Sequence, residues 1–256
     1  MSVLICPVCG GDLIKSEKSY KCPSNHSFDI AKEGYVNLLQ GSKSGDKMGD
    51  SRESAKARHT FHAKNYYIHL KNEIAKRMSG RVLDICCGEG YYDDYDGEIY
   101  GFDISREMVR LASRSNKNAI YFVSNLAKIP VKDNSIDTAV HLFAPFKGKE
   151  FSRVLNKNGR LYSVIPGENH LIELKNAVYD TPYKNDEKAP VCDELSLISK
   201  TKISDRIDIP AEDVKTLFSM TPYFYRTSEK DKAKLDNNCP KQITFEFVIL
   251  EYKKSR

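Results

Sequence analysis

Short apolar runs rich in β-branched and aromatic residues recur through the middle of the chain, separated by charged and glycine-containing segments. Some of the intervening stretches have helical spacing, including Ser105–Ser115, where Ser105 can cap the first turn, and Lys149–Leu155. Strands that alternate with helices predict an α/β fold with a doubly wound, Rossmann-like parallel sheet. The predicted strands are Arg81–Cys86, Glu98–Asp103, Ala119–Ser124, Ile136–Phe143 and Arg160–Pro166.

The segments on either side of this core follow other patterns. From Ser54 to Met78 the apolar residues have a helical period, which predicts one helix with Tyr67 on its apolar face. Residues Pro210–Met220 predict a helix that begins at proline. Gln242–Tyr252 predicts a long final strand, which would add an antiparallel strand to the sheet.

The first part of the chain predicts a separate small module. Residues 1–37 contain closely spaced cysteines, and residues 38–52 are rich in Gly, Ser, Lys and Asp without an apolar period. The second stretch is typical of a linker. We therefore expect a module over residues 1–37, a linker over 38–52, and an α/β domain over 53–256.

Composition narrows the class of protein. The chain has 256 residues, 40% of them apolar, which is enough for one sizeable core and a small satellite module. It contains no apolar stretch long enough to span a bilayer, and its first residues lack the features of a secretory signal. The seven cysteines are therefore expected to be thiols and metal ligands in a cytoplasmic protein. The net charge of +5 is compatible with a nucleic-acid partner but does not indicate one by itself.

Four residues near the N-terminus have the spacing of a zinc site. Cys6 and Cys9 form a C-x2-C pair, and Cys22 and His26 form a C-x3-H pair twelve residues later. Each pair can turn two ligands toward one point, so that two pairs complete a tetrahedral shell. Because protein ligands would fill all four positions, we expect the zinc to be structural.

A strand followed by a glycine-rich turn predicts a cofactor site. Val82–Ile85 leads into Cys86-Cys87-Gly88-Glu89-Gly90, and Asp103 ends the next predicted strand. Glycines let backbone N–H groups approach a ligand, and an acidic residue after the second strand can accept hydrogen bonds from ribose hydroxyls. The order D-x-C-C-G-x-G is typical of S-adenosylmethionine (SAM) methyltransferases, where Asp84 would support the loop and the methionine amino group.

Residues after the fourth predicted strand should border the transferred methyl group. The segment Leu142–Phe146 contains no Asn-Pro-Pro-Tyr or Asp-Pro-Pro-Tyr tetrad to hold an exocyclic amine, and no Pro-Cys nucleophile for attack on a pyrimidine ring. These absences argue against methylation of an exocyclic adenine or cytosine amine, and against pyrimidine C5.

Four segments together resemble the RlmA/RrmA family of 23S rRNA guanine-N1 methyltransferases. The matching runs are CPVC…CPSNHSFDIAKEGYVNLL at 6–39, VLDICCGEGYY at 82–92, FAPFKGKEFSRVLNKNGRLYSVIPGENHLIELK at 143–175, and MTPY at 220–223. The resemblance implies methyl transfer from SAM to N1 of a guanine in a hairpin loop of 23S rRNA, and a homodimer. It also implies that Cys6, Cys9, Cys22 and His26 bind zinc and that Tyr67, Glu89, Gly90 and His170 contact the cofactor.

The chain departs from this family at two points. Cys86 replaces the first glycine of the usual turn, and the connection from Gly90 to Gly101 is too short for the family's helix. Two other functions stay open. One is methylation of a small molecule, because D-x-C-C-G also occurs in quinone-type methyltransferases, although a small substrate gives no reason for a zinc module. The other, which these departures suggest, is RNA binding by a relative whose SAM site has decayed.

Single residues carry less information. Phe143, Phe146, Tyr223 and Phe224 are candidate platforms for stacking an unpaired base. His170 could contact the cofactor or transfer a proton, whereas His141 lies in an apolar strand and is expected to be a satisfied core residue. Candidate phosphate contacts are Lys32, Lys43, Lys47, Arg52, Lys56 and Arg58, although such a charged run is as often a solvated face.

Overall fold

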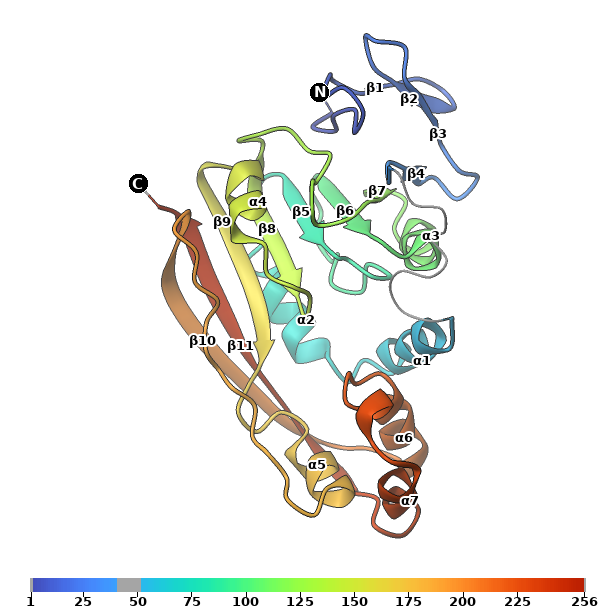
Figure 1. Ribbon diagram of the computed structural model, residues 1–256, viewed down its shortest axis with the longest axis vertical. Helices are drawn as coiled ribbons and strands as arrows, with labels where there is room; N and C mark the ends of the chain where they lie inside the picture. The colour runs from blue at the N-terminus through green and yellow to red at the C-terminus, as the bar shows by residue number, and fades with distance from the viewer. Residues whose placement is uncertain (1, 41–51, 256) are drawn as a thin grey trace.

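The computed structural model describes residues 2–40 and 52–255, with the side chains of residues 52 and 53 left out. Figure 1 shows three parts along the long axis: an N-terminal module at one end, a central sheet, and a group of C-terminal helices at the other end. In the described residues, no helix is long and apolar enough to cross a membrane.

The central sheet has eight strands in the order β10-β11-β9-β8-β5-β6-β7-β4. All five strands predicted in the middle of the chain are present and parallel, and the predicted final strand lies antiparallel to β9, which confirms the Rossmann-like parallel sheet with an added antiparallel strand. The strands are β4 (Val36–Asn37), β5 (Val82–Ile85), β6 (Ile99–Asp103), β7 (Ile120–Val123), β8 (Ile136–Leu142), β9 (Leu155–Pro166), β10 (Leu195–Asp208) and β11 (Gln242–Lys254).

The sheet buries both of its faces. On one face, Leu83 and Ile85 of β5 share a core with Phe151 of α4 (Gly148–Val154) and with Leu4 of the N-terminal module. On the other, Val82 and Val140 pack with residues of α2 (Ile68–Ala75). On that same face α3 (Arg106–Ser115) covers the β7 end, and Ser105 caps α3 as predicted, with Oγ accepting a hydrogen bond from Met108 N at 3.4 Å.

The single helix expected from Ser54 to Met78 is instead two helices, α1 (Arg52–Ala63) and α2. The break follows from Asn65, which adopts φ 58°, a left-handed conformation that asparagine tolerates better than most residues. Because the chain turns there, Tyr67 becomes the N-cap of α2 and its ring lies among buried residues of the sheet.

The N-terminal module carries a three-stranded antiparallel sheet of β1 (Ile14–Lys15), β2 (Ser19–Lys21) and β3 (Ser27–Asp29). Backbone hydrogen bonds, in addition to the covalent chain, join this module to the α/β domain. Ile5 N donates to Pro130 O at 3.0 Å, and β4, at the end of the expected module, pairs in parallel with β7. Most of the expected linker, residues 41–51, lies outside the described residues.

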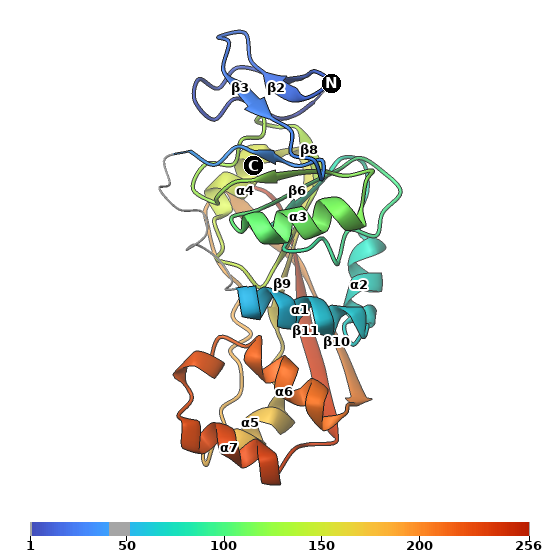
Figure 2. The same ribbon diagram turned by 90° about the vertical axis from the view of Figure 1, so that its right-hand side faces the viewer.

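Beyond the end of β9, β10 and β11 continue together as a two-stranded ribbon. One helix, α5 (Ile172–Val178), follows β9. Three more lie between β10 and β11: α6 (Ala211–Ser219), the short helix η2 (Phe224–Arg226) and α7 (Glu229–Asn237). Figure 2 shows these helices gathered below α1, away from the zinc-ligand module. The sequence predicted α6 but not α5, α7 or β10.

Candidate cofactor cavity and zinc centre

The four predicted zinc ligands converge in the N-terminal module. One ligand atom from each of Cys6, Cys9, Cys22 and His26 lies within 4.8 Å of the others. The closest pair is Cys22 Sγ to His26 Nδ1 at 3.3 Å, followed by Cys6 Sγ to His26 Nδ1 and Cys9 Sγ to Cys22 Sγ, both at 3.6 Å. Such separations suit the edges of a tetrahedron with zinc–ligand bonds of about 2.0–2.3 Å. The donor set and its geometry therefore fit a structural zinc ion.

The backbone prepares both pairs of ligands. In the first, Gly10 adopts φ 77° and donates to Cys6 O at 2.8 Å; in the second, Asn25 adopts φ 62° and donates to Cys22 O at 2.9 Å. The backbone N–H of Gly11, helped by the His26 side chain, lowers the pKa of the Cys9 thiol to about 6. A thiol that ionises readily is prepared to bind a metal, because zinc takes the thiolate.

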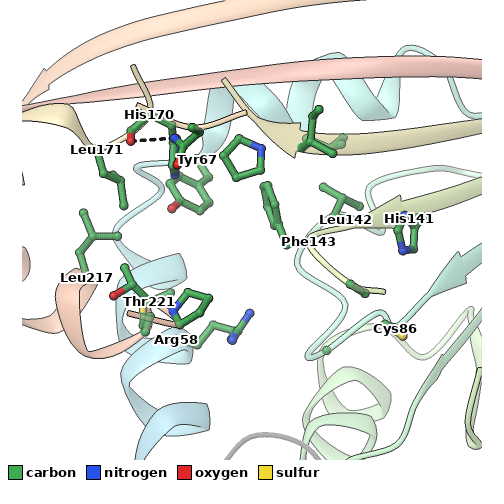
Figure 3. Close-up of a pocket in the computed structure, with 18 of the residues that line it drawn as sticks. Arg58, Tyr67, Cys86, His141, Leu142, Phe143, His170, Leu171, Leu217 and Thr221 are labelled. Atoms are coloured by element: carbon green, nitrogen blue, oxygen red, sulfur yellow. Dashed lines mark hydrogen bonds between the residues drawn. The ribbon is translucent and has the colours of Figure 1, made fainter. Parts of the chain in front are cut away.

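A large cavity lies at the carboxyl ends of β5, β8 and β9, where open α/β sheets bind ligands. Its volume is about 830 Å³, so side chains do not fill it. The predicted cofactor residues Tyr67, Asp84, Gly88, Glu89 and His170 line it, whereas Gly90 and Asp103 are not among its lining residues. Figure 3 shows the cavity bounded on one side by Phe143, His141 and Cys86 and on the other by Leu171 and Leu217.

In the glycine-rich turn, every second residue from 86 to 90 has a left-handed conformation: Cys86 at φ 59°, Gly88 at φ 55° and Gly90 at φ 73°. A Cβ on Gly88 would meet only Met108 Cε, at 3.7 Å, so the backbone there stays open to a ligand. A Cβ on Gly90 would lie 2.7 Å from the Tyr121 hydroxyl. Gly90 therefore acts in packing, and Cys86 holds a strained conformation that glycine would adopt freely.

The side chain of Asp84 is buried, and no hydrogen bond from the described residues offsets the cost of that burial. It is 1% exposed, and neither carboxyl oxygen has a hydrogen-bond partner among the described residues. Burial raises the pKa of Asp84 well above its ordinary value, and the charge of Asp93 adds to that effect. Asp93 accepts a hydrogen bond from Tyr121 at 2.6 Å, and burial raises its pKa to about 6. A cationic ligand would satisfy this acidic wall, as the amino group of SAM would.

Asp103 supports the turn from the next strand. Its Oδ2 accepts a hydrogen bond from Gly88 N at 3.1 Å, and its Oδ1 accepts one from Ser105 N at 2.8 Å. The carboxylate thus stands beside the open glycine at the edge of the sheet, where a ribose would lie. The short connection from Gly90 to Gly101 contains turns and no helix, as expected from its length.

Glu89 is held between two histidines from α1, which the sequence did not predict. Oε1 accepts a hydrogen bond from His62 Nδ1 at 2.7 Å, and Oε2 is hydrogen-bonded to His59 Nδ1. Burial alone would raise the pKa of Glu89, but the hydrogen bonds from His62 and His59 outweigh it and leave the pKa below its ordinary value. The contact fixes α1 against the glycine-rich turn and places Arg58 of α1 at the cavity.

His170 and Tyr67 lie together at the cavity wall (Figure 3), with ring centroids 6.4 Å apart. His170 Nδ1 is buried and finds no partner in the part of the chain that is described. Burial, and then the charge of Lys175, lower the pKa of His170 to about 3, so the ring is neutral at physiological pH. It can therefore accept a hydrogen bond from a ligand.

His141 departs from the expectation of a satisfied core residue. Its Nδ1 is hydrogen-bonded to Ser163 Oγ at 2.9 Å, but its Nε2 is buried with no partner among the described residues. The ring packs against Phe146 and Phe151 and borders the cavity beside Cys86. The prediction of a fully hydrogen-bonded core histidine was wrong because His141 pairs with Ile85 at the end of β5, where the glycine-rich turn begins. His141 therefore lies at the cavity and not inside the core.

The wall across the cavity comes from α5 and the segments around it. Lys175 is 1% exposed, and its Nζ donates to Asn185 Oδ1 at 2.6 Å and to Tyr183 O at 3.2 Å. Tyr179, Tyr223 and Arg226 line the same wall. No sequence pattern indicated Lys175, because its partners lie eight and ten residues further along an irregular stretch.

The candidate base platforms and phosphate contacts are distributed unevenly. Phe143, Phe146 and Tyr223 line the cavity, whereas Phe224 packs on Phe218 outside it. Of the six basic residues, Arg58 lines the cavity, and Lys32 and Lys56 are exposed. Lys43 and Lys47 lie outside the described residues, and the side chain of Arg52 is not described.

Comparison with known proteins follows the same division of the chain. The model of the RlmA N-terminal zinc ribbon matches residues 4–43, and a model of a methyltransferase domain matches residues 82–161. A putative 23S rRNA (guanine-N1) methyltransferase of Micromonospora griseorubida is 30% identical over 91% of this chain and 89% of its own length. The 23S rRNA (guanine(748)-N1) methyltransferase of Streptomyces fradiae is 30% identical over 68% and 67%, and a putative enzyme of Bacillus subtilis is 30% identical over 71% of both chains.

Proposed function

Because the chain belongs to the RlmA family of 23S rRNA (guanine-N1) methyltransferases, we propose that it transfers a methyl group from SAM to N1 of a guanine in 23S rRNA. The observation that carries the proposal is the open cavity at the sheet edge, with the uncompensated Asp84 carboxyl in its wall. A decayed site would have no reason to keep that buried carboxyl unpaired, since doing so costs stability.

SAM would bind on the wall formed by the end of β5 and the glycine-rich turn. Asp84 would bind the methionine amino group, the open backbone at Gly88 would face the cofactor, and Asp103 would hold the ribose hydroxyls. Tyr67, Glu89 and His170 complete the proposed contacts, and Gly90 shapes the turn behind them. The volume of about 830 Å³ is near the upper end of the range of about 300–1,000 Å³ for small-molecule sites, which leaves room for a base beside the cofactor.

SAM, when bound, supplies an electrophilic methyl group on a positively charged sulfur. The protein must then hold guanine N1 in line with that methyl while N1 loses its proton, and much of the rate should come from this positioning. N1 lies on the edge of guanine that pairs in a duplex, so the target base must be unpaired to enter the cavity. A hairpin loop meets this requirement, and Phe143, at the cavity mouth and 43% exposed, is suited to stack on the base.

Further proposals go with this function. The zinc ion is structural, because protein ligands occupy all four positions. The chain forms a homodimer and works in the cytoplasm, where its ribosomal substrate is transcribed. Lys32, Lys43, Lys47, Arg52, Lys56 and Arg58 contact RNA phosphates, and the module over residues 1–37 presents the RNA to the domain over residues 53–256.

Methylation of purified 23S rRNA tests the function. Ribosomal RNA from cells lacking guanine-N1 methylation, incubated with the protein and methyl-labelled SAM, should gain 1-methylguanosine in nucleoside mass spectrometry and a new stop in primer extension. The variant Asp84→Asn should be about 10- to 100-fold less active at limiting SAM. Label at another atom, or incorporation into a small metabolite but not RNA, would refute the proposal.

A further inference from the structure

A buried ammonium group lies on the cavity wall opposite the glycine-rich turn. Lys175 is 1% exposed, and its two hydrogen-bond acceptors are a backbone carbonyl and an amide oxygen, which carry no charge. No carboxylate of the described residues forms an ion pair with it. A buried charge without a counter-charge is costly, so a ligand atom carrying negative charge would stabilise this wall.

The lysine is held in place by neighbouring groups. Asn185 Nδ2 donates to Gly167 O at 2.8 Å and to His170 O at 3.3 Å, which orients its Oδ1 toward Lys175 Nζ. The Nζ also lies 4.4 Å from the centre of the Tyr183 ring. These contacts fix the ammonium without neutralising it, and they leave one of its three N–H donors for a ligand.

Lys175 lies on the wall across the cavity from Cys86 and the glycine-rich turn. It follows Leu171 by one helical turn, and Figure 3 shows Leu171 and Leu217 across the cavity from Phe143 and Cys86. The space between the two walls is where an acceptor base would lie, with Tyr179, Tyr183 and Tyr223 around it. Asp84 and Lys175 thus give the cavity one acidic and one basic side.

We propose that the ammonium of Lys175 binds O6 of the target guanine and stabilises the anion that forms when N1 loses its proton. The inference rests on the proposed function. The N1 proton passes to solvent hydroxide, and the negative charge spreads over N1 and O6. The N1 electron pair then forms the bond to the methyl carbon as the carbon–sulfur bond breaks, and its electrons return to sulfur as the thioether. An ammonium donor at this point also rejects adenine, which has an amino group in place of O6.

Kinetics of Lys175→Met test this role, with Lys184→Met as the matched control, since Lys184 is an exposed lysine paired with Glu168 outside the cavity. Lys175→Met should bind SAM normally in calorimetry and keep its KM for RNA. Its kcat near neutral pH should fall about 10²- to 10³-fold, the usual loss when one donor to a developing anion is removed. The rate should continue to rise with pH beyond the wild-type plateau, because N1 must then ionise without help, and Lys175→Arg should recover part of the loss.

Other outcomes would overturn the role. Weaker SAM binding by Lys175→Met would place the lysine on the cofactor carboxylate, and a higher KM for RNA with a smaller salt dependence would place it on a phosphate. If Lys175→Met does not fold, Lys175→Gln, which keeps a hydrogen-bond donor beside Asn185 but carries no charge, tests the role instead. Its kcat near neutral pH should also fall and should also keep rising with pH beyond the wild-type plateau, and an undiminished kcat would contradict the proposal. Failure of the wild-type protein to form 1-methylguanosine in ordinary RNA would refute the proposed function itself.

Discussion

The zinc centre takes its four ligands from residues 6–26, whereas the cavity takes its walls from segments spread between residues 58 and 226. In the zinc centre, short turns with Gly10 and Asn25 in left-handed conformation set the geometry locally. In the cavity, Asp84 and Lys175 face the same space only because β5, β9 and α5 are placed by the whole fold. Local spacing therefore determines the first site, and long-range packing determines the second.

Removal of one zinc ligand should have the largest effect and should show how far the two regions are coupled. Cys22→Ser should abolish stoichiometric zinc and unfold the module, because structural zinc contributes about 10–16 kcal/mol in small zinc-binding modules. Since Leu4 shares a core with Ile85, the α/β domain should also melt at a lower temperature. Zinc content and hydrogen exchange would measure the two effects.

The control is Cys239→Ser, which alters a thiol distant from the module and should keep both zinc and melting temperature. If Cys22→Ser unfolded the module but left the domain's exchange unchanged, the module and the domain would be energetically independent, contrary to their shared core.

The same contrast explains what the sequence could predict. The zinc ligands, the five parallel strands and the glycine-rich turn follow from spacing and periodicity within short windows. The turn at Asn65 was missed because the residues on both sides of it keep a helical apolar pattern. The long strand β10 was missed because it lies at the sheet edge, where few of its side chains are buried. The partners of Lys175 and His141 depend on irregular segments and on neighbouring strands, so no local pattern indicates them.

Asp84→Asn should have the next largest effect and would test the acidic side of the cavity. Loss of a hydrogen bond to a charged group costs about 1.5–3 kcal/mol, so SAM affinity should fall about 10- to 100-fold in calorimetry. The folded-state pKa of Asp84 is raised, so its carboxyl costs stability as pH rises through that pKa. The ligand-free variant should therefore be more stable than the wild type at alkaline pH.

Asp94→Asn is the matched control, because Asp94 is an exposed carboxylate of the connection between β5 and β6 and pairs with Lys71 of α2. It should leave SAM affinity unchanged. Equal weakening by both variants would show that the overall acidic charge of this region, and not the buried carboxyl, attracts the cofactor.

The pH dependence of SAM binding should sharpen this result. In the free protein, burial and then Asp93 hold the pKa of Asp84 above its ordinary value, whereas a bound ammonium would lower it. SAM affinity should therefore rise with pH, by up to about tenfold per unit, until the free-protein pKa is passed. Calorimetry in buffers of different ionisation enthalpy should detect proton release on binding. Asp84→Asn should lose most of this release, and proton uptake by the wild type would contradict the assignment.

Cys86→Gly should have the smallest effect. It compares the two regions directly, because it places glycine at a left-handed position of the glycine-rich turn, as Gly10 is placed in the first turn of the zinc centre. Cys86 holds φ 59°, and relief of a left-handed side-chain conformation is worth about 1–2 kcal/mol, less the entropy that glycine adds to the unfolded chain. The melting temperature should rise by about 2–4 °C for each kcal/mol that remains. If the strained turn is not yet in the conformation that binds SAM, SAM affinity should rise as well. If the turn already has that conformation, SAM affinity should stay the same while stability rises. A lower melting temperature would show that the thiol's packing against the sheet outweighs the strain, and would make Cys86 a structural residue of the turn.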